Sequence, residues 1–261
     1  MTAATAELVG LLAIPVFLIL DLVVRHRRFE APRFWRLQAL AVSAAMFAVS
    51  VAATLAWGTL LAGRSLLDLS GLGTWAAAAV GILVYELVHY WYHRAVHRYD
   101  VMWKFCGHQM HHSAESLDAW GALYNHPVDT FFFTSWVALV FFPLLGLTPE
   151  AGAIGAAFVN VNAMIQHANI RTPRWLGYLV QRPESHSVHH GRHRNNYADL
   201  PLWDLVFGTF ENPREMEQQV GFYNGASRRI GEMLLGRDVS RPRAPRERAG
   251  TTAGVRLEEV A

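Results

Sequence analysis

Histidine is the residue type in this chain whose number and spacing could do chemistry, because most of the thirteen histidines lie in a few short clusters. Two clusters share the spacing His-x-x-His-His and begin at His108 and His186. A third cluster places His89, His93 and His97 at intervals of four residues. Neutral imidazole is a good ligand for iron, copper, zinc and nickel. The clusters therefore predict a site that binds a transition metal.

A fourth short motif runs from Gln166 to Asn169 and contains His167. Apart from His89, the four clusters contain nine histidines. One ion takes roughly four to six ligands, so nine imidazoles suit two ions better than one. Without metal, so many imidazoles facing each other would repel on protonation. The number of histidines therefore predicts two metal ions in one site.

A helix is the element that would bring these side chains together, because residues three and four apart share one of its faces. On a helix His89, His93 and His97 form a stripe, and Glu86 lies one turn earlier. The same argument predicts that each His-x-x-His-His motif points its three rings into one sector. A carboxylate that accepts from the second ring nitrogen would orient each ring. Six acidic residues are candidates for this role: Glu86, Glu115, Asp129, Glu184, Asp199 and Asp204.

The composition places these helices in a membrane. The chain is 52% hydrophobic and 17% charged, whereas about a quarter of the residues in a soluble domain are charged. The first seven residues contain no lysine or arginine, so we expect the first apolar stretch to be retained rather than cleaved as a signal. A full crossing needs about 20 apolar residues. The candidate stretches are 8–24, 39–62, 75–88, 130–147 and 151–165, the last two forming a hairpin.

The arginines predict the orientation, because cytoplasmic loops are enriched in Lys and Arg. The loop 25–36 contains five arginines, and the loop after the second apolar stretch contains only Arg64. We therefore expect every histidine cluster on the cytoplasmic face, which in a bacterium is that of the inner membrane. The predicted fold class is all-α: a multi-span membrane helical bundle with a cytosolic histidine-rich helical cap.

Three parts are expected along the chain. Residues 1–74 form N-terminal membrane helices, residues 75–212 form the catalytic domain, and residues 213–261 form a C-terminal cytosolic segment. From about Arg237 this segment is rich in Arg, Pro, Gly and Thr, which predicts disorder. The single cysteine, Cys106, excludes an intrachain disulfide and a cysteine metal site. The net charge of +2 predicts no nucleic-acid partner.

Histidines outside the clusters have simpler interpretations. His26 is expected at the surface, because a lone histidine is usually only partly buried. His193 follows the fourth cluster in an arginine-rich turn and is interpreted as a non-ligand. His89 lies on the correct helical face but deeper in the membrane. We interpret it as a hydrogen-bonding neighbour of the site, with a ligand role left open.

The histidine motifs and their surroundings resemble the fatty acid hydroxylase and sterol desaturase superfamily of membrane di-iron, histidine-cluster oxygenases. The similarity lies in residues 86–169 and 183–210, about half of the chain. Its motifs, in order, are Tyr90-Trp91-Tyr92-His93-Arg94-x-x-His97, His108-x-x-His111-His112-Ser113, Asn125-His126-Pro127-Val128-Asp129, His167-Ala168-Asn169-Ile170, His186-x-x-His189-His190, Asn196-Tyr197 and Trp203-Asp204-x-x-Phe207-Gly208-Thr209-Phe210.

The resemblance implies two Fe ions as cofactors and O2 as co-substrate. It also implies a separate electron donor, either a cytochrome or a ferredoxin supplied by an NAD(P)H reductase. Carried over by position, the implied metal ligands are His93, His97, His108, His111, His112, His167, His186, His189 and His190.

The chain departs from the superfamily pattern beside His167. Some members have another histidine four or five residues earlier, where this chain has Ala163 and Asn162. A tenth ligand is therefore open. Asn162 could bind through its amide or a water, or His126 could complete the set.

These observations predict an O2-dependent, non-haem di-iron oxidoreductase of the membrane that hydroxylates or desaturates a lipid C–H bond. The metals would do the oxidation, so no catalytic side chain beyond the ligands is expected. The apolar stretches 75–88 and 130–147 lead to the clusters and would admit the lipid. Zinc can replace iron during purification, because it binds nitrogen ligands more tightly than ferrous iron.

Two other functions suit a histidine-rich membrane protein. A membrane metal carrier would distribute its polar ligands along several helices, whereas these clusters are predicted to gather at one end. A zinc-dependent membrane hydrolase needs only three protein ligands, and the sequence has no His-Glu-x-x-His motif. Both alternatives are less consistent with the sequence than the oxygenase.

Overall fold

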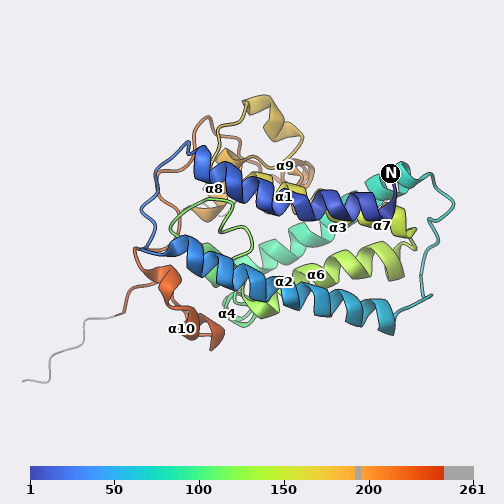
Figure 1. The fold of residues 1–261 in the computed structure, drawn as a ribbon, viewed down its shortest axis with the longest axis horizontal. Helices are drawn as coiled ribbons and strands as arrows, with labels where there is room; N and C mark the ends of the chain where they lie inside the picture. Colours follow the sequence, from blue (N-terminus) through green and yellow to red (C-terminus); the bar gives the residue numbers. More distant parts are fainter. Residues whose placement is uncertain (192–194, 244–261) are drawn as a thin grey trace, which may run out of the picture.

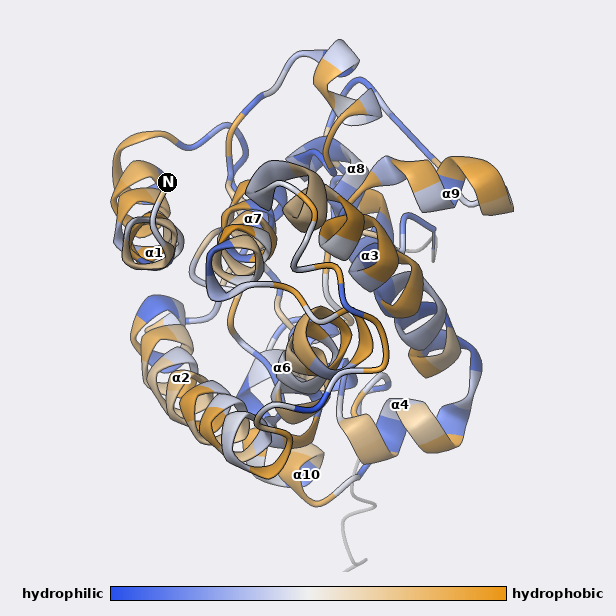
Figure 2. Cartoon of the chain, turned by 90° about the vertical axis from the view of Figure 1, so that its right-hand side faces the viewer, coloured by the Kyte–Doolittle hydropathy of each residue, from blue (hydrophilic) through white to orange (hydrophobic). Residues whose placement is uncertain are grey.

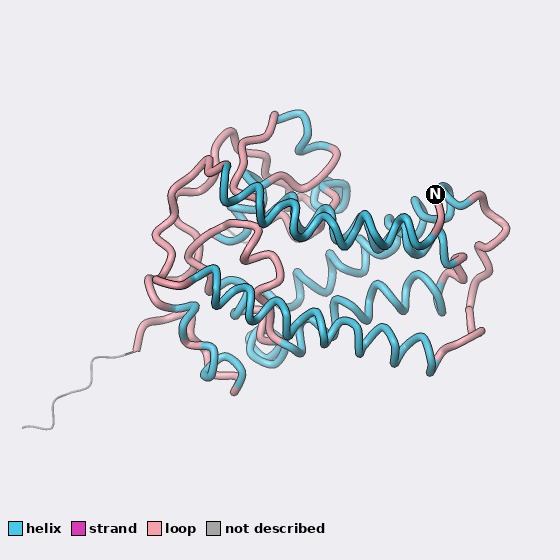
Figure 3. Tube along the Cα trace, viewed as in Figure 1, coloured by secondary structure: helices cyan, strands magenta, loops and turns pink. Residues whose placement is uncertain are grey.

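Helices are the only regular elements in the part of the chain that the computed structural model describes, residues 1–191 and 195–243. Five long helices lie side by side (Figure 1): α1 Ala3–Val23, α2 Trp35–Leu60, α3 Thr74–Arg98, α6 Pro127–Leu139 and α7 Pro149–His167. Short helices and loops gather toward one end of this bundle (Figure 3): α4 Asp100–Cys106, α5 Gln109–His112, α8 Pro183–His190, α9 Pro201–Phe207 and α10 Ile230–Leu234. The predicted helical bundle with a histidine-rich cap is confirmed.

Three helical segments are long and apolar enough to cross a membrane: α1, α2 and Pro127–Leu144. The third comprises α6 and the π-helical turn that follows it, Val140–Leu144. Pro143 lies in this turn and lacks the N–H needed for a regular helical hydrogen bond. The chain is an integral membrane protein, and the apolar colouring of α1, α2 and α6 is visible in Figure 2.

The α6–α7 hairpin forms the centre of the bundle. α1 packs on α7, α2 packs on α6, and α3 packs on α7 (Figure 2). The contact between α1 and α7 is close, because a Cβ added at Gly10 would lie 3.1 Å from the Cα atom of Ala157. Small residues permit this approach, and van der Waals packing then holds membrane helices together where lipid provides no hydrophobic driving force.

Asp21, near the end of α1, joins the bundle to the cap. Its buried carboxylate accepts hydrogen bonds from the backbone N–H groups of Ala119 and Asn169, the second at 3.0 Å. The Asn169 side chain accepts from the Arg27 N–H at 2.8 Å and donates to the Arg27 carbonyl at 2.7 Å. These bonds fix the loop after α1 against the residues that follow α7.

Residues 237–243 pack on the cap rather than leaving it. Val239 is fully buried, and its N–H donates to Oε1 of Gln109 at 2.9 Å. The Gln109 amide in turn donates to the Arg237 carbonyl at 2.9 Å. The expectation of disorder from about residue 237 was therefore wrong for this stretch, because one apolar side chain and two backbone groups find partners on α5. The rest of that prediction concerns residues 244–261, which lie outside the described residues.

Candidate metal centre

The nine clustered histidines lie in two groups, and all nine are buried. Within each group, one ring nitrogen of every histidine lies within 4.8 Å of the others. The first histidine group is His93, His97, His108, His112 and His189. The second histidine group is His111, His167, His186 and His190.

Each His-x-x-His-His motif contributes to both groups. His108 and His112 belong to the first group, whereas His111 belongs to the second. In α8 the assignment is reversed, with His189 in the first group and the other two histidines in the second. The prediction that each motif points into one sector was wrong, because neighbouring residues on a helix differ by about 100° in direction. The two groups therefore share two short helices and adjoin each other.

In the first group, Nε2 of His108 lies 2.9 Å from Nε2 of His93 and 3.1 Å from Nε2 of His112. His93 Nδ1 donates to the Tyr197 carbonyl at 2.7 Å, and His108 Nδ1 donates to the Asp129 carboxylate at 2.6 Å. A neutral imidazole has one N–H, so Nε2 of both rings is an unprotonated lone pair. Lone pairs this close repel each other unless a cation lies between them.

The second group has the same arrangement. Nε2 of His167 lies 3.1 Å from Nε2 of His111 and 3.0 Å from Nε2 of His186, which is 3.0 Å from Nε2 of His190. His167 Nδ1 donates to the Ala163 carbonyl at 2.8 Å, so its Nε2 is also a lone pair. Nitrogens at right angles around an ion with bonds of roughly 2.1 Å are about 3.0 Å apart. Both groups therefore have the donor atoms, spacing and tautomers that fit a metal ion.

Burial keeps the histidines of α5 and α8 neutral. It lowers the pKa of His189 to about 3. Burial, followed by the neighbouring imidazoles, lowers the pKa well below its usual value for His111, His112, His186 and His190. Neutral imidazole is the form that binds metal. These rings are therefore ready to bind a metal at neutral pH without first losing a proton.

Asp129 is confirmed among the predicted carboxylates as a group that orients a ring. Its Oδ2 accepts from His108 Nδ1, and its Oδ1 accepts from the Tyr92 hydroxyl at 3.1 Å. Both the aspartate and His108 are almost completely buried. Asp199 lies 3.7 Å from Nδ1 of His89, which is outside both groups.

The other four carboxylates do not contact a ring of either group directly, so that part of the prediction was wrong. Asp204 accepts from the N–H groups of Tyr197 and Ala198 at 2.8 and 2.9 Å. Glu86 accepts from the N–H groups of Asp199 and Leu200, at 2.9 and 3.0 Å. They position the loop whose Tyr197 carbonyl orients His93. Glu115 and Glu184 likewise bind backbone groups of neighbouring loops.

Backbone carbonyls orient three of the rings, and the sequence gives no signal for them. They belong to Tyr197, Ala163 and Asn195, and they accept from His93, His167 and His189. Every residue has a carbonyl, so residue types cannot identify the ones that point at a ring.

His126 lies outside both groups and caps α6. Its Nδ1 accepts from the Val128 N–H at 3.2 Å, as an N-cap side chain does. The structure therefore gives His126 a capping role through Nδ1 and places it in neither histidine group, while its Nε2 is buried without a hydrogen-bond partner. His26 lies 3.6 Å from the exposed carboxylate of Glu215 and is only part-buried, as expected for a surface residue.

His89 and Asn162 lie beside the two groups rather than in them. The His89 ring stacks on His93, with centroids 5.3 Å apart and an interplanar angle of 3°. His89, Glu86 and Asp199 form a smaller buried cluster of their own. The Asn162 amide donates to the Asp199 carbonyl at 2.7 Å. His89 and Asn162 therefore contact the surroundings of the two groups without belonging to either. His193 lies outside the described residues.

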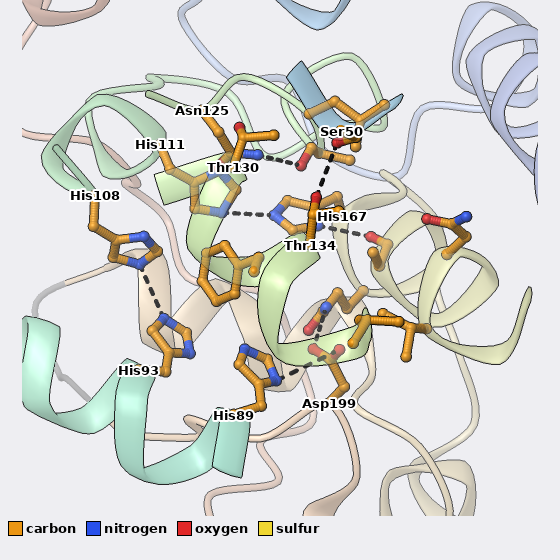
Figure 4. A pocket seen from close by; sticks show the side chains of 18 of the residues that line it. Ser50, His89, His93, His108, His111, Asn125, Thr130, Thr134, His167 and Asp199 are labelled. Atoms are coloured by element: carbon orange, nitrogen blue, oxygen red, sulfur yellow. Dashed lines mark hydrogen bonds and ion pairs between the residues drawn. The ribbon is translucent and has the colours of Figure 1, made fainter. Parts of the chain in front are cut away.

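A cavity of about 190 Å³ adjoins both histidine groups (Figure 4). Six histidines line it: His93 and His108 of the first group, His111, His167 and His186 of the second, and His89 beside them. The rest of the lining comes from α2, α3, α6 and α7, including Phe133, Val137 and Val159, and from the loops that contain Leu123 and Asp199. The cavity thus lies against both histidine groups and against the long helices of the bundle.

The chain is similar to a family model and to several known proteins. A family model described as fatty acid hydroxylase matches residues 78–209. The alkylglycerol monooxygenase of Homo sapiens is 35% identical over 149 residues, which are 54% of this chain and 32% of that protein. The sphinganine C4-monooxygenase 1 of Arabidopsis thaliana is 26% identical over 135 residues, 49% of this chain and 52% of that protein.

A very-long-chain aldehyde decarbonylase of Oryza sativa subsp. japonica is 26% identical over 139 residues, 48% of this chain and 22% of that protein. The chain spans about a third of the length of the alkylglycerol monooxygenases that it matches. No solved structure matches the chain. The range matched by the family model, residues 78–209, contains all nine histidines of the two groups.

Proposed function

Because the chain belongs to the fatty acid hydroxylase family, we propose that it is a membrane oxygenase that hydroxylates a lipid C–H bond with O2 and external electrons. The observation that supports this most is the pair of histidine groups beside one cavity. Neighbouring Nε2 atoms lie 2.9–3.0 Å apart, which is about the distance between two nitrogen ligands of one metal ion. Five of the nine rings line the cavity. A desaturase would use the same site, because it also begins by breaking a C–H bond.

The proposal assigns one iron to each histidine group. The nine ligands are those of the first and second histidine groups, with no tenth side chain required. Bound iron would supply the activation of O2, which no side chain can perform alone. In the overall reaction one oxygen atom enters the lipid and the other leaves as water. Two electrons and two protons must arrive from outside.

The protein's own side chains orient the ligands and shape the space in front of them. Asp129 and the Tyr197 carbonyl fix the tautomers of His108 and His93. Phe133 and Val137 give the cavity apolar walls, which exclude water and contact an aliphatic chain. The target C–H bond must lie where the cavity meets the five proposed ligands that line it.

We propose that the cap faces the cytoplasm, because loop 25–36 contains five arginines and lies at the cap end. A cytochrome, or a ferredoxin with its NAD(P)H reductase, would deliver electrons from that side. Alkylglycerols and sphinganine, which the names of two relatives mention, are the first lipids to test.

The experiment is oxidation of lipid by the iron-loaded full chain in membranes, with a chemical reductant and labelled O2. Lipid mass spectrometry should show a product heavier by one labelled oxygen atom, dependent on iron. A His111→Asn, His112→Asn double variant is the matched control and should give none. The proposal would be refuted if the lipid were oxidised equally well without iron, or if the product contained no oxygen from the labelled O2.

The alternative functions fit the structure less well. A metal carrier would need ligands along a path through the helices, whereas the nine histidines form two adjoining groups at one end. A zinc hydrolase uses three protein ligands and an open position, and each group here supplies more than three.

A further inference from the structure

The cavity beside the metal centre also has hydrogen-bonding side chains, and the proposed function does not yet use them. Ser50 of α2, Thr130 and Thr134 of α6, and Asn160 of α7 line it (Figure 4 labels the first three). All four lie in the long helices of the bundle. Polar groups inside a membrane are costly and indicate function by default. Their position in the lining suggests contact with whatever enters the cavity.

Thr130 has an unused hydroxyl. Its side chain is buried, with 7% of the residue exposed, and its Oγ1 has no hydrogen-bond partner. A buried polar group without a partner costs about 1–3 kcal/mol, so a ligand that bonded to it would recover that energy. Thr130 lines the same cavity as His108 and His111. An oxygen atom bonded to Thr130 would therefore lie close to the metal centre.

Ser50 and Thr134 form a second polar position, where α2 meets α6. Their hydroxyl oxygens are 3.1 Å apart. A hydroxyl offers one donor and two acceptor lone pairs, so this pair retains capacity for a ligand. Thr134 lies one helical turn from Thr130 on α6. The two positions together can bind a group with more than one oxygen atom.

The lining also limits the charge of the ligand. Among the described residues that line the cavity there is no lysine or arginine, and the acidic residue present is Asp199. In the metal-free chain a carboxylate or phosphate would enter without a cationic side chain as a partner, which is unfavourable at a buried site. The volume of about 190 Å³ is below the roughly 300–1,000 Å³ typical of ligand pockets. The cavity therefore suits an uncharged, short part of a lipid, with the remaining chain outside.

We propose that Thr130, with the Ser50–Thr134 pair, binds an uncharged hydroxyl or ether oxygen of the lipid within a few bonds of the carbon that is oxidised. The position of the oxidised carbon in this inference rests on the proposed function. The lipid-binding site does not. It defines the substrate class as neutral lipids with oxygen near the start of the chain. Free fatty acids and plain hydrocarbons fall outside that class.

The test measures binding to metal-free full chain in nanodiscs, so that it does not depend on oxidation. The probes are radiolabelled hexadecyl glycerol ether, hexadecane and palmitate. The ether should bind at least about tenfold more tightly than the other two, as loss of one or more hydrogen bonds at a buried site predicts. Thr130→Val should weaken ether binding about fivefold and leave hexadecane binding unchanged. Equal affinity for the three probes would overturn the inference.

A matched control is Thr59→Val, because Thr59 lies on α2 but is exposed and bonds to the Ala56 carbonyl of its own helix. It should leave ether binding unchanged. Thr130→Val should not lower the Tm, since it replaces a hydroxyl that has no partner with a methyl group. A lower Tm would show that Thr130 has a structural role and would overturn its assignment.

Oxidation assays then separate the two proposals. Selective ether binding without any oxidised product would leave the lipid site intact and refute the oxygenase. Oxidation of hexadecane or palmitate as readily as of the ether would support the oxygenase and refute the lipid site.

Discussion

His93 and His108 show that the nitrogen away from the metal determines what the metal-facing nitrogen can do. Each donates its Nδ1–H to a fixed acceptor, the Tyr197 carbonyl or the Asp129 carboxylate. The two Nε2 atoms, 2.9 Å apart, are therefore both acceptors. Two lone pairs this close repel each other unless a cation lies between them. The hydrogen bonds made by Nδ1 therefore indicate a metal site as strongly as the histidines themselves do.

Replacing Asp129 with Asn should weaken metal binding without unfolding the protein. The amide is the same size but lacks the charge that favours Nδ1–H on His108, and loss of such a partner costs about 10–100-fold in metal affinity. Competition with a metal-binding dye, at matched protein concentration, measures the change. Asp68→Asn is the control, because Asp68 is exposed and bonds only locally to Ser70. Equal affinity in both variants would show that Asp129 does not orient a ligand.

The assignment of His126 as a helix cap, rather than a ligand, makes a matched pair of variants informative. His126→Asn should retain both metal ions, because Asn is also a favourable N-cap residue. His112→Asn should lose about one ion, because it removes a member of the first histidine group. Metal analysis of both purified variants decides, and metal loss from His126→Asn would restore it as a ligand.

At the scale of elements, the sequence predicted what depends on helical periodicity. The stripe of His89, His93 and His97 on α3 follows from their spacing, and all three are buried on that helix. The division of each His-x-x-His-His motif between two groups has two causes. The angle of about 100° between adjacent residues of a helix could have been read from the spacing. The way in which α5 and α8 lie against each other could not. The backbone carbonyls that accept from the histidine Nδ1 atoms were not predicted either. The Tyr197 carbonyl, for example, reaches His93 only through the path of its loop.

Gly107, between α4 and α5, is a place where one element must turn closely against another. Its φ is +73°, and an added Cβ would collide with the His126 ring. Gly208 also has φ +73°, but an added Cβ would meet nothing within 4 Å. Gly208→Ala should cost roughly 1–2 kcal/mol of backbone strain, lowering the Tm by a few degrees. Gly107→Ala should lower the Tm at least about twice as far. Equal shifts in thermal unfolding would show that the His126 contact is unimportant.

At the scale of the whole molecule, metal binding and folding are linked. The first and second histidine groups draw ligands from α3, α5, α7 and α8 and from His108 just before α5, so a metal ion in either group ties separate elements together. Burial of the imidazoles in one place also makes the metal-free fold sensitive to protons. The centre is thus a structural element of the cap as well as its chemical site.

The metal-free protein should lose stability as the pH falls below about 6.5. The five histidines of α5 and α8 have pKa values lowered by burial, to about 3 for His189. The unfolded chain takes up protons near pH 6.5 while the folded chain does not, so unfolding is favoured there. Burial raises the pKa of Asp204 to about 6 and also raises the pKa of Asp118; both act in the opposite direction, against five histidines. A Tm that stays constant or rises from about pH 8 to pH 5.5 would contradict this expectation.

The most direct test of the central claim is the number of iron ions bound per chain. Purified protein reconstituted anaerobically with ferrous iron, then freed of excess metal, should contain two per chain by elemental analysis. X-ray absorption should show nitrogen ligands at about 2.1 Å and little sulfur or carboxylate. One iron per chain, or two irons coordinated mainly by oxygen, would contradict the account of two histidine groups that each bind an ion.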